Sequence, residues 1–513
     1  MFRLKRATLA GATILATAWL GACSTNNAGT AAGEGNVLRV AQQAFPSTLD
    51  PHDANESAAA IVHRHLFQTL VTQTPEMEIV PNLATSWQQV NDTTIEFTLR
   101  QGVTFHNGDE LTADDVVFSL LRALDNPRVS HIVGMLDAST VEAVDRYTVR
   151  VGTAEPFSPL LNHLSHPAGS IVPQQLITEI GDAAFADNPV GSGPFQYASR
   201  IHGDFVELDR FEDYTGTATD LDGMIFRTII EGSSRIIELE TGEIDVVLAV
   251  DPSDVSRVDN DANLVLHRAP DLRTEYLGFN VNNEYLSNVL VRRAIAHAIN
   301  TEDIIHAVFE GIGARALGPI GPNVFGAYAG VEGHAFDPAL SLELLAEAGL
   351  ADGFELNFLI DEAPLRVAQA TIIQNQLAQI GITASITTRD WATYIQETGE
   401  GAHDIFLLGW TTVTGDADYG LYALFHSRNA GAPGNRSFFE NAELDALLDE
   451  AKATTDEATR IELYRQAQLI IVEEAPWAFI RHGENIVGLS GRVQNFELHP
   501  AAHHNLSVIS LEN

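Results

Sequence analysis

Hydrophobic and polar residues alternate strictly through residues 94–100. Ile95, Phe97 and Leu99 share one side of this pattern, whereas threonine, glutamate and arginine side chains occupy the other. A period of two is typical of a strand that has one buried face and one exposed face. The pattern therefore predicts a half-buried strand at this point of the chain.

The residues after this strand predict a turn and then an amphipathic helix. Residues 103–105 have the pattern of a second short strand, and Asn107-Gly108 is typical of a tight turn. Thr112 stands where a helix N-cap is expected, and Asp115 follows three residues later, as in a weak capping box. The apolar stripe of the helix comprises Val116, Val117, Leu120 and Leu121.

Residues 353–409 alternate between the strand period and the helix period. Such alternation predicts strand–helix–strand units and a parallel sheet that is covered by helices. The predicted strands are 354–360, 382–387 and 404–408, and the predicted helices are 365–380 and 391–397. This part of the chain indicates the α/β class.

Length and charge narrow the class of protein. The chain has 513 residues, which exceeds one ordinary hydrophobic core and predicts two or three domains. Its net charge is −40, and removal of an N-terminal segment with Arg3, Lys5 and Arg6 would take it to −43. Lys452 is the only other lysine. So acidic a protein is a poor partner for nucleic acid or an anionic lipid surface.

The N-terminus predicts export and lipid attachment. Residues 1–6 are basic and residues 7–20 are apolar, as in a secretory signal. Leu-Gly-Ala-Cys then ends at Cys23 and resembles a bacterial lipobox, so residues 1–23 are assigned as a lipoprotein signal peptide and residues 24–36 as a flexible tether. Cys23 is the only cysteine, so an intramolecular disulfide is excluded. We expect an extracytoplasmic protein anchored to the cell membrane through the lipidated Cys23.

Four short motifs resemble one protein family. They are Leu-Asp-Pro at 49–51, VPNLATSW at 80–87, FTLRQGVTFHNGDELTADDVVFS at 97–119 and NPVGSGPF at 188–195. Together they resemble the extracytoplasmic solute-binding proteins of family 5, which serve peptide, opine and nickel ABC importers. The resemblance covers residues 37–513 and implies an α/β fold of the periplasmic-binding-protein type II, with two lobes joined by a hinge.

The resemblance also implies a discontinuous first domain. Domain I comprises residues 37–58, 188–272 and 487–513, domain II is the insertion 59–187, and domain III, the second lobe, comprises 273–486. The hinge candidates are 264–279 and 481–489.

The segment 404–441 carries the most specific local resemblance. In the dipeptide and oligopeptide binders of the family, an aspartate three residues after a tryptophan pairs with the ligand ammonium, and here that position is Val413. The pattern Gly-Trp, then Thr-Gly-Asp-Ala-Asp-Tyr, is instead similar to the glutathione-importer subgroup. We therefore expect glutathione or a short peptide as the ligand.

Such a zwitterion requires both an anionic and a cationic partner. Arginine suits a carboxylate because its planar guanidinium donates two parallel hydrogen bonds. The candidate ligand-binding residues are Trp410, Asp416, Asp418, Tyr419, Arg366 and Arg436, with an aspartate for the ammonium, the arginines for carboxylates and the aromatic rings as walls. Alternative interpretations are a core position for Trp410, a helix cap for Asp418 and an ion pair for Arg436.

The histidines raise the possibility of a metal site. His63 and His65 are two residues apart, and His499, His503 and His504 are clustered. No Cys/His set has zinc-ligand spacing, so we interpret these residues as surface histidines and expect no metal and no cofactor.

Enzyme motifs are absent from the sequence. It contains no G-x-S-x-G elbow and no Gly-Lys-Ser/Thr phosphate loop. We therefore expect a non-enzymatic, monomeric binding protein that delivers its ligand to an ABC permease with separate ATPase subunits. The open alternatives are a nickel-chelate or general oligopeptide binder and, in another class, a sensory or chaperone-like lipoprotein.

Overall fold

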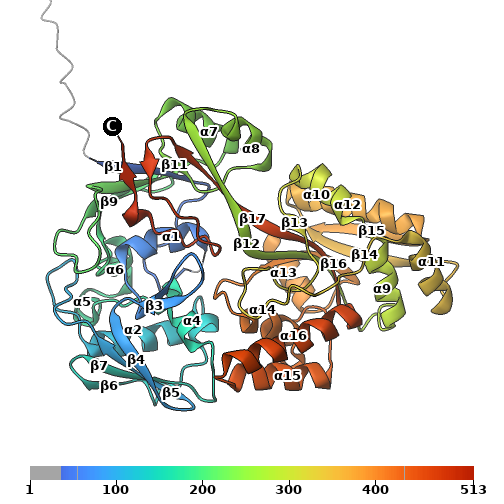
Figure 1. Ribbon diagram of the computed structural model, residues 1–513, viewed down its shortest axis with the longest axis horizontal. Coiled ribbons are helices and arrows are strands. Elements are labelled where there is room, and N and C mark those ends of the chain that lie inside the picture. The colour runs from blue at the N-terminus through green and yellow to red at the C-terminus, as the bar shows by residue number, and fades with distance from the viewer. Residues whose placement is uncertain (1–35, 55, 432–433, 513) are drawn as a thin grey trace, which may run out of the picture. The chain divides into compact units, whose positions relative to one another are not determined.

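Two long strands connect the two sides of the main sheet. β12 (Leu264–Phe279) and β17 (Trp477–Ser490) run antiparallel and side by side, as Figure 1 shows. β17 also pairs with β11 (Val246–Val247), whereas β12 pairs with β16 (Ile405–Thr411). The two strands thus belong to both halves of one sheet.

The structure is a computed structural model that describes residues 36–54, 56–431 and 434–512. The predicted signal peptide, the lipobox Cys23 and the tether up to residue 35 lie outside the described residues. We call residues 36–263 and 491–512 the first lobe and residues 280–476 the second lobe.

The first lobe contributes one half of the sheet. Its strands follow β17 in the order β11-β1-β10-β9-β8, with β1 parallel to β10 and to β11. The strands not yet given are β1 (Val37–Gln42), β8 (Phe195–Ile201), β9 (Phe205–Arg210) and β10 (Gly223–Thr228).

The second lobe contributes the other half and confirms the predicted α/β segment. β14 (Phe354–Asp361) pairs in parallel with β15 (Ile382–Arg389) and with β16. The helices between them are α12 (Pro364–Gln379) and α13 (Trp391–Gly399), within two residues of the predicted bounds. The short β13 (Ala314–Arg315) pairs with β17.

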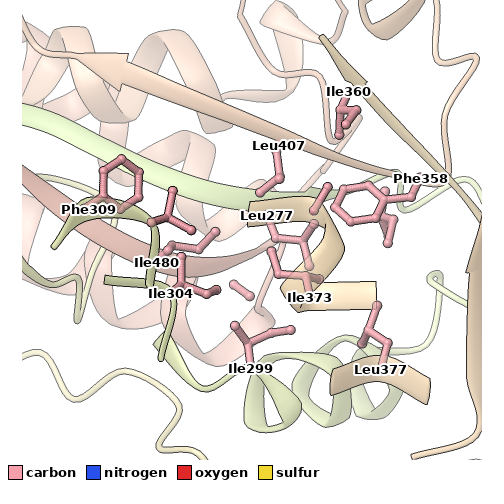
Figure 2. Close-up of a cluster of buried hydrophobic side chains, with 14 of the residues drawn as sticks. Leu277, Ile299, Ile304, Phe309, Phe358, Ile360, Ile373, Leu377, Leu407 and Ile480 are labelled. Atoms are coloured by element: carbon pink, nitrogen blue, oxygen red, sulfur yellow. The ribbon is translucent and has the colours of Figure 1, made fainter. Parts of the chain in front are cut away.

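A large hydrophobic cluster packs against this sheet. Its side chains come from β12, β14, β16, β17 and the helices beside them, and Figure 2 shows Leu277, Phe358, Leu407 and Ile480 gathered together. All four are fully buried. Burial of such side chains contributes about 1.5–3 kcal/mol each, which anchors the lobe to the long strands.

The predicted strand at residues 94–100 lies in a separate four-stranded sheet. Its order is β4-β5-β7-β6, and the strands are β4 (Ala84–Asn91), β5 (Thr94–Leu99), β6 (Glu142–Asp145) and β7 (Thr148–Gly152). Ile95, Phe97 and Leu99 are buried, as the alternation predicts. Residues 103–105 form only an isolated bridge from Thr104 to Glu110, so the second short strand was a wrong prediction.

The helix predicted after it is α2 (Ala113–Asp125). Its N-cap is Thr112, whose backbone N–H donates to Asp115 Oδ2 over 2.9 Å, as in a capping box. Val116 and Leu120 are buried and Val117 and Leu121 are partly buried against the same core, which confirms the apolar stripe.

Two of the family-like motifs bind each other. The backbone N–H of His106 donates to Gly191 O over 2.8 Å, and His106 Nδ1 accepts from the N–H of Gly191 over 3.1 Å. A Cβ on Gly191 would lie 1.9 Å from Leu66 O, so only glycine fits there. Similarly, Arg122 of α2 pairs with Asp50 in the Leu-Asp-Pro turn. These motifs therefore have structural roles.

The hydrophobic clusters of the structure do not coincide with the three predicted domains. Residues 70–171 share one hydrophobic cluster, but α1 (Ser57–Leu66) and α6 (Asp182–Asp187) pack with the strands of residues 37–58 and 188–272. The domain boundaries and the hinge role of residues 264–279 and 481–489 stay predictions. The register of β12 and β17 shifts between Pro270 and Thr274, inside the first hinge candidate.

The remaining elements surround these sheets. Among the described residues, no helix combines the length and the apolar character that crossing a bilayer requires. The remaining strands are β2 (Val71–Gln73), β3 (Ile79–Pro81), β18 (Val493–Gln494) and β19 (Ser510–Leu511). The remaining helices are α3 (Ser130–Val133), α4 (Leu160–Leu164), α5 (Gln174–Ile180), α7 (Gly232–Thr241), α8 (Pro252–Asp259), α9 (Val289–Ala298), α10 (Thr301–Phe309), α11 (Pro338–Glu347), α14 (Ala417–Phe425), α15 (Ala442–Ala453) and α16 (Glu457–Glu474), with 3-10 turns at Pro167–Gly169, Ser427–Asn429 and Leu506–Val508.

Candidate functional site

The two lobes touch at the loop between β16 and α14. Gln73 Nε2 of the first lobe donates to Thr414 O of the second over 2.7 Å, and Asn162 Nδ2 donates to the same oxygen over 3.3 Å. Both Gln73 and Thr414 are buried. The segment that sequence analysis selected for the ligand therefore lies at the contact between the lobes.

A second contact joins the lobes at the end of α15. The backbone N–H of Ser158 donates to Lys452 O over 2.8 Å. The Lys452 ammonium lies 4.4 Å from the ring centre of Tyr422 and 5.9 Å from that of Phe157. Lys452 is thus held between aromatic rings of the two lobes by cation–π attraction.

Trp410 and Tyr419 form an aromatic pair beside this contact. Trp410 Nε1 donates to Tyr419 O over 3.0 Å, and the two ring centres are 5.3 Å apart. Both side chains are half-buried, and the Tyr419 ring meets the edge of His163 in the first lobe. Both rings are thus partly exposed at the contact between the lobes.

Asp416 is engaged within the protein. It is the N-cap of α14, accepting from the N–H of Asp418 over 3.0 Å, and it pairs with Arg460 Nη2 over 2.8 Å. Tyr464 also donates to it over 3.3 Å. With its charge neutralised by Arg460, Asp416 has less capacity for a ligand ammonium than Asp418.

Asp418 is a buried carboxyl group with an unused acceptor. Its Oδ1 is buried and has no hydrogen-bond partner. Burial raises its pKa to about 7, and the neighbouring charge of Asp416 adds to the shift. The alternative that Asp418 caps the helix is not what the structure has, because Asp416 occupies that position.

Arg366 is a buried arginine with an incompletely used guanidinium. It lies in the first turn of α12, and its Nε donates to Asp361 Oδ2 over 3.3 Å. Its Nη1 is buried without a hydrogen-bond partner. The free edge of the guanidinium matches the two oxygens of a carboxylate.

Arg436 donates hydrogen bonds inside the second lobe through one nitrogen of its guanidinium. Its Nη1 donates to Ile395 O over 2.6 Å and to Thr398 Oγ1 over 2.7 Å, near the end of α13. Burial lowers its pKa. Among the described residues, no carboxylate lies within ion-pair distance of it, so the alternative of an acidic partner is not seen.

Sequence analysis missed a buried charge cluster on the long strands. Glu275 of β12 accepts from Arg481 and Arg273 over 3.2 and 3.3 Å, and its Oε2 has no partner. Burial raises the pKa of nearby Asp271 to about 6. The available signal was Glu275 next to the apolar run 276–279, since a glutamate is rarely buried unpaired.

A cavity opens beside the interlobe contact. Its volume is about 740 Å³, within the range of small-ligand sites. It is lined by 75–79 and Asn162 of the first lobe and by 322–325, Asp416, Thr455, Glu457 and Arg460 of the second, together with Pro500.

The histidines are buried, which corrects the prediction of surface residues. His63, His65, His499, His503 and His504 are each less than 10% exposed. Four of them bond to the backbone through a ring nitrogen; for example, His65 Nε2 accepts from the N–H of Leu506 over 3.0 Å, whereas His503 Nδ1 accepts from the Arg64 side chain. Within the described part of the chain, no three His, Cys, Asp or Glu side chains are grouped closely enough to hold a metal ion.

Comparisons with known proteins agree on one family. The family model of bacterial extracellular solute-binding proteins, family 5, matches residues 78–432. The dipeptide-binding protein of Escherichia coli K12 is 30% identical over 463 residues, covering 85% of this chain and 86% of that protein. The glutathione-binding protein GsiB of Salmonella typhi is 32% identical over 464 residues, covering 86% and 89%.

Solved structures share the fold. The structure of HbpA2 from Haemophilus parasuis superposes with a TM-score of 0.85 at 29% sequence identity. The match covers 93% of this chain and 100% of that one.

Proposed function

Because the chain belongs to family 5 of the bacterial extracellular solute-binding proteins, we propose that it is the receptor of an ABC importer for glutathione or short peptides. Its fold is that of the type II periplasmic binding proteins, with two lobes joined by a hinge. Members of this family bind solutes and are not enzymes. The ligand would be bound reversibly between the lobes and passed on unchanged to the permease.

One observation carries the choice of a zwitterionic ligand. The second lobe holds a buried carboxyl group, Asp418, and a buried guanidinium, Arg366, each with an unpartnered polar atom. Burying such groups without partners is costly, whereas a ligand with both an ammonium and a carboxylate would satisfy them. Glutathione and short peptides carry both groups.

The remaining candidates have supporting roles in this proposal. Trp410 and Tyr419 form aromatic walls beside the interlobe contact. Asp416 holds the start of α14 and thereby positions Asp418, and Arg436 supports the end of α13. In this proposal Asp416 and Arg436 do not contact the ligand; they hold in place the helices that surround it.

The proposal extends to location and partners. Cys23 would carry the lipid anchor and keep a monomeric receptor near the permease and its ATPase subunits. Globomycin sensitivity of the precursor and mass spectrometry of the mature N-terminus test the anchor directly, because only a diacylated cysteine gives the corresponding mass gain. A mature protein that starts elsewhere would refute it.

Of the two ligands in this proposal, a short peptide is the alternative to glutathione. The relative in Escherichia coli, a dipeptide-binding protein at 30% identity, favours it. Val413, which stands where peptide binders of the family carry an aspartate, speaks against it.

The deciding experiment uses protein from residue 24 onward, refolded to remove carried-over ligand. Isothermal titration calorimetry with reduced glutathione, alanyl di- and tetrapeptides and nickel–histidine would rank the ligands. Native mass spectrometry of the unrefolded protein would identify what co-purifies. We expect glutathione to bind at least ten-fold more tightly than nickel–histidine. Binding of nickel–histidine alone, or of none of these ligands, would refute the proposal.

A further inference from the structure

The first lobe contains a second cavity that the proposed ligand site does not use. Its volume is about 310 Å³, and all of its lining residues belong to the first lobe. Within the described ranges, the second lobe contributes no lining residue, and only Gln73 of the lining also bonds to it, through Thr414 O. Its polar lining includes Arg64, Gln68, Gln73, His499, His503 and His504.

Arg64 brings an uncompensated positive charge to this cavity. The side chain is partly buried, and its Nη2 donates to His503 Nδ1 over 2.6 Å and to Ser165 O over 3.4 Å. Its Nε is fully buried without a partner. Among the described residues, no carboxylate lies within ion-pair distance of Arg64, and removal from water lowers its pKa to about 9. The two groups that accept hydrogen bonds from Arg64, His503 Nδ1 and Ser165 O, are both uncharged.

The three histidines present hydrogen-bond donors. His499 Nδ1 accepts from the N–H of Ala501 over 3.1 Å, and His504 Nδ1 accepts from the N–H of His499 over 3.0 Å. His503 Nδ1 accepts from Arg64. Burial lowers the pKa of all three rings, so each is a neutral imidazole with its proton on Nε2.

One of these donors is unused. His499 Nε2 is buried and has no hydrogen-bond partner. The carbonyl oxygen of Gln73 lies near the ring and slightly raises its pKa, yet no hydrogen bond of normal geometry joins them. The lining also contains acceptors, among them the carboxylate of Glu497 at the exposed rim and the unpartnered Gln68 Oε1.

We propose that this cavity binds a compact anion, a small molecule with a carboxylate or phosphate group held by Arg64 and His499 Nε2. An anion would compensate the guanidinium charge and occupy the unused donors, which are otherwise left unpaired at a cost. The volume accommodates a small organic acid as well as inorganic phosphate. Gln68 Oε1 would accept from a hydroxyl group of the ligand.

The test uses the whole chain from residue 24 and titrates inorganic phosphate and citrate by calorimetry. His499→Asn is the sharpest variant, because the Asn oxygen can still accept from the N–H of Ala501 while the Nε2 donor is lost. We expect binding about ten-fold weaker, since a hydrogen bond to a charged group is worth that much. Arg64→Gln should abolish binding, and the exposed Arg128→Gln should leave it unchanged.

The outcomes separate this site from the glutathione site. Unchanged glutathione binding by His499→Asn, together with weaker anion binding, supports an independent site. Binding of citrate but not phosphate indicates an organic acid as the ligand, and binding of phosphate but not citrate indicates a phosphate group. The proposal would be overturned if neither anion gave a heat of binding, or if the wild type and His499→Asn bound the anion with equal affinity. These outcomes decide the question even if Arg64→Gln fails to fold.

Discussion

Gln73 and Thr414 join the two lobes through a buried hydrogen bond of 2.7 Å, from the side-chain amide of one to the backbone carbonyl of the other. Because the acceptor belongs to the backbone, a substitution of Thr414 would not remove it. The strength of this contact is therefore set by the donors of the first lobe, mainly Gln73 and, over a longer distance of 3.3 Å, Asn162.

We expect Gln73→Ala to weaken glutathione binding about two- to ten-fold, because one net hydrogen bond of about 0.5–1.5 kcal/mol is lost from the closed form. Calorimetry measures the affinity, and small-angle scattering of the ligand-bound protein should show a larger radius of gyration. Gln88→Ala, which removes an exposed hydrogen bond to Glu96, is the matched control. Equal losses in both variants would contradict a role in closure.

Arg366→Lys should weaken glutathione binding by about ten-fold or more. Lysine keeps the charge that faces Asp361 but loses the planar fork that takes a carboxylate with two bonds. Arg436→Lys is the matched variant and should mainly lower the melting temperature, because Arg436 bonds to Ile395 and Thr398. If Arg366→Lys bound like the wild type, the carboxylate assignment would be wrong.

Glutathione binding at pH 7 should release protons. The pKa of Asp418 is about 7 without a ligand, so part of the population is protonated, and an ammonium beside it would lower that pKa. Calorimetry in buffers of low and high ionisation enthalpy measures the proton count. Asp418→Asn should show no such release; proton release of wild-type size from this variant would exclude Asp418 as its source.

Asp418 also predicts how stability depends on pH. Its folded pKa, about 7, lies above the usual value of 3.8, so the folded state keeps a proton that the unfolded state loses. The free energy of unfolding should therefore fall between about pH 4 and pH 7, by on the order of 1 kcal/mol per pH unit from this group. Urea unfolding at pH 5 and pH 8 should show a smaller fall for Asp418→Asn. A fall of equal size in both proteins would contradict the burial of this carboxyl.

Arg460→Ala should destabilise the second lobe by about 3–5 kcal/mol, because it leaves Asp416 buried without a counter-charge. Arg465→Ala on the same helix removes an exposed pair with Glu462 and should cost at most about 1 kcal/mol. Urea unfolding of both variants gives the comparison. Similar losses would mean that the Asp416 pair is no stronger than a surface pair.

Patterns of neighbouring residues predicted most of the helices and strands. They did not predict which charged and histidine side chains are buried, or against what they pack. The capping box at Thr112 and the strands and helices of residues 354–411 depend on near neighbours, and they formed as expected. The burial of His65 depends on Leu506, more than four hundred residues away, which no local period reveals.

In the candidate site, too, contacts between distant parts of the chain could not be predicted from the sequence. The sequence named Trp410 and Tyr419 only as candidate walls; that their ring centres lie 5.3 Å apart emerged from the structure. It could not distinguish Asp416 from Asp418, since the difference comes from Arg460 on a distant helix. Nor could it find the charge cluster around Glu275, which forms only when β12 and β17 pair.

Lys452 is one of only two lysines in the chain. It is the only lysine after residue 5, and it sits where α15 meets the first lobe through Ser158. Below the pKa of lysine, an amine-reactive fluorophore would thus modify one side chain of the chain from residue 24, apart from its α-amino group, and that side chain lies at the contact between the lobes. If the lobes move on ligand binding, as proposed, a fluorophore on Lys452 would report that movement without an engineered attachment site.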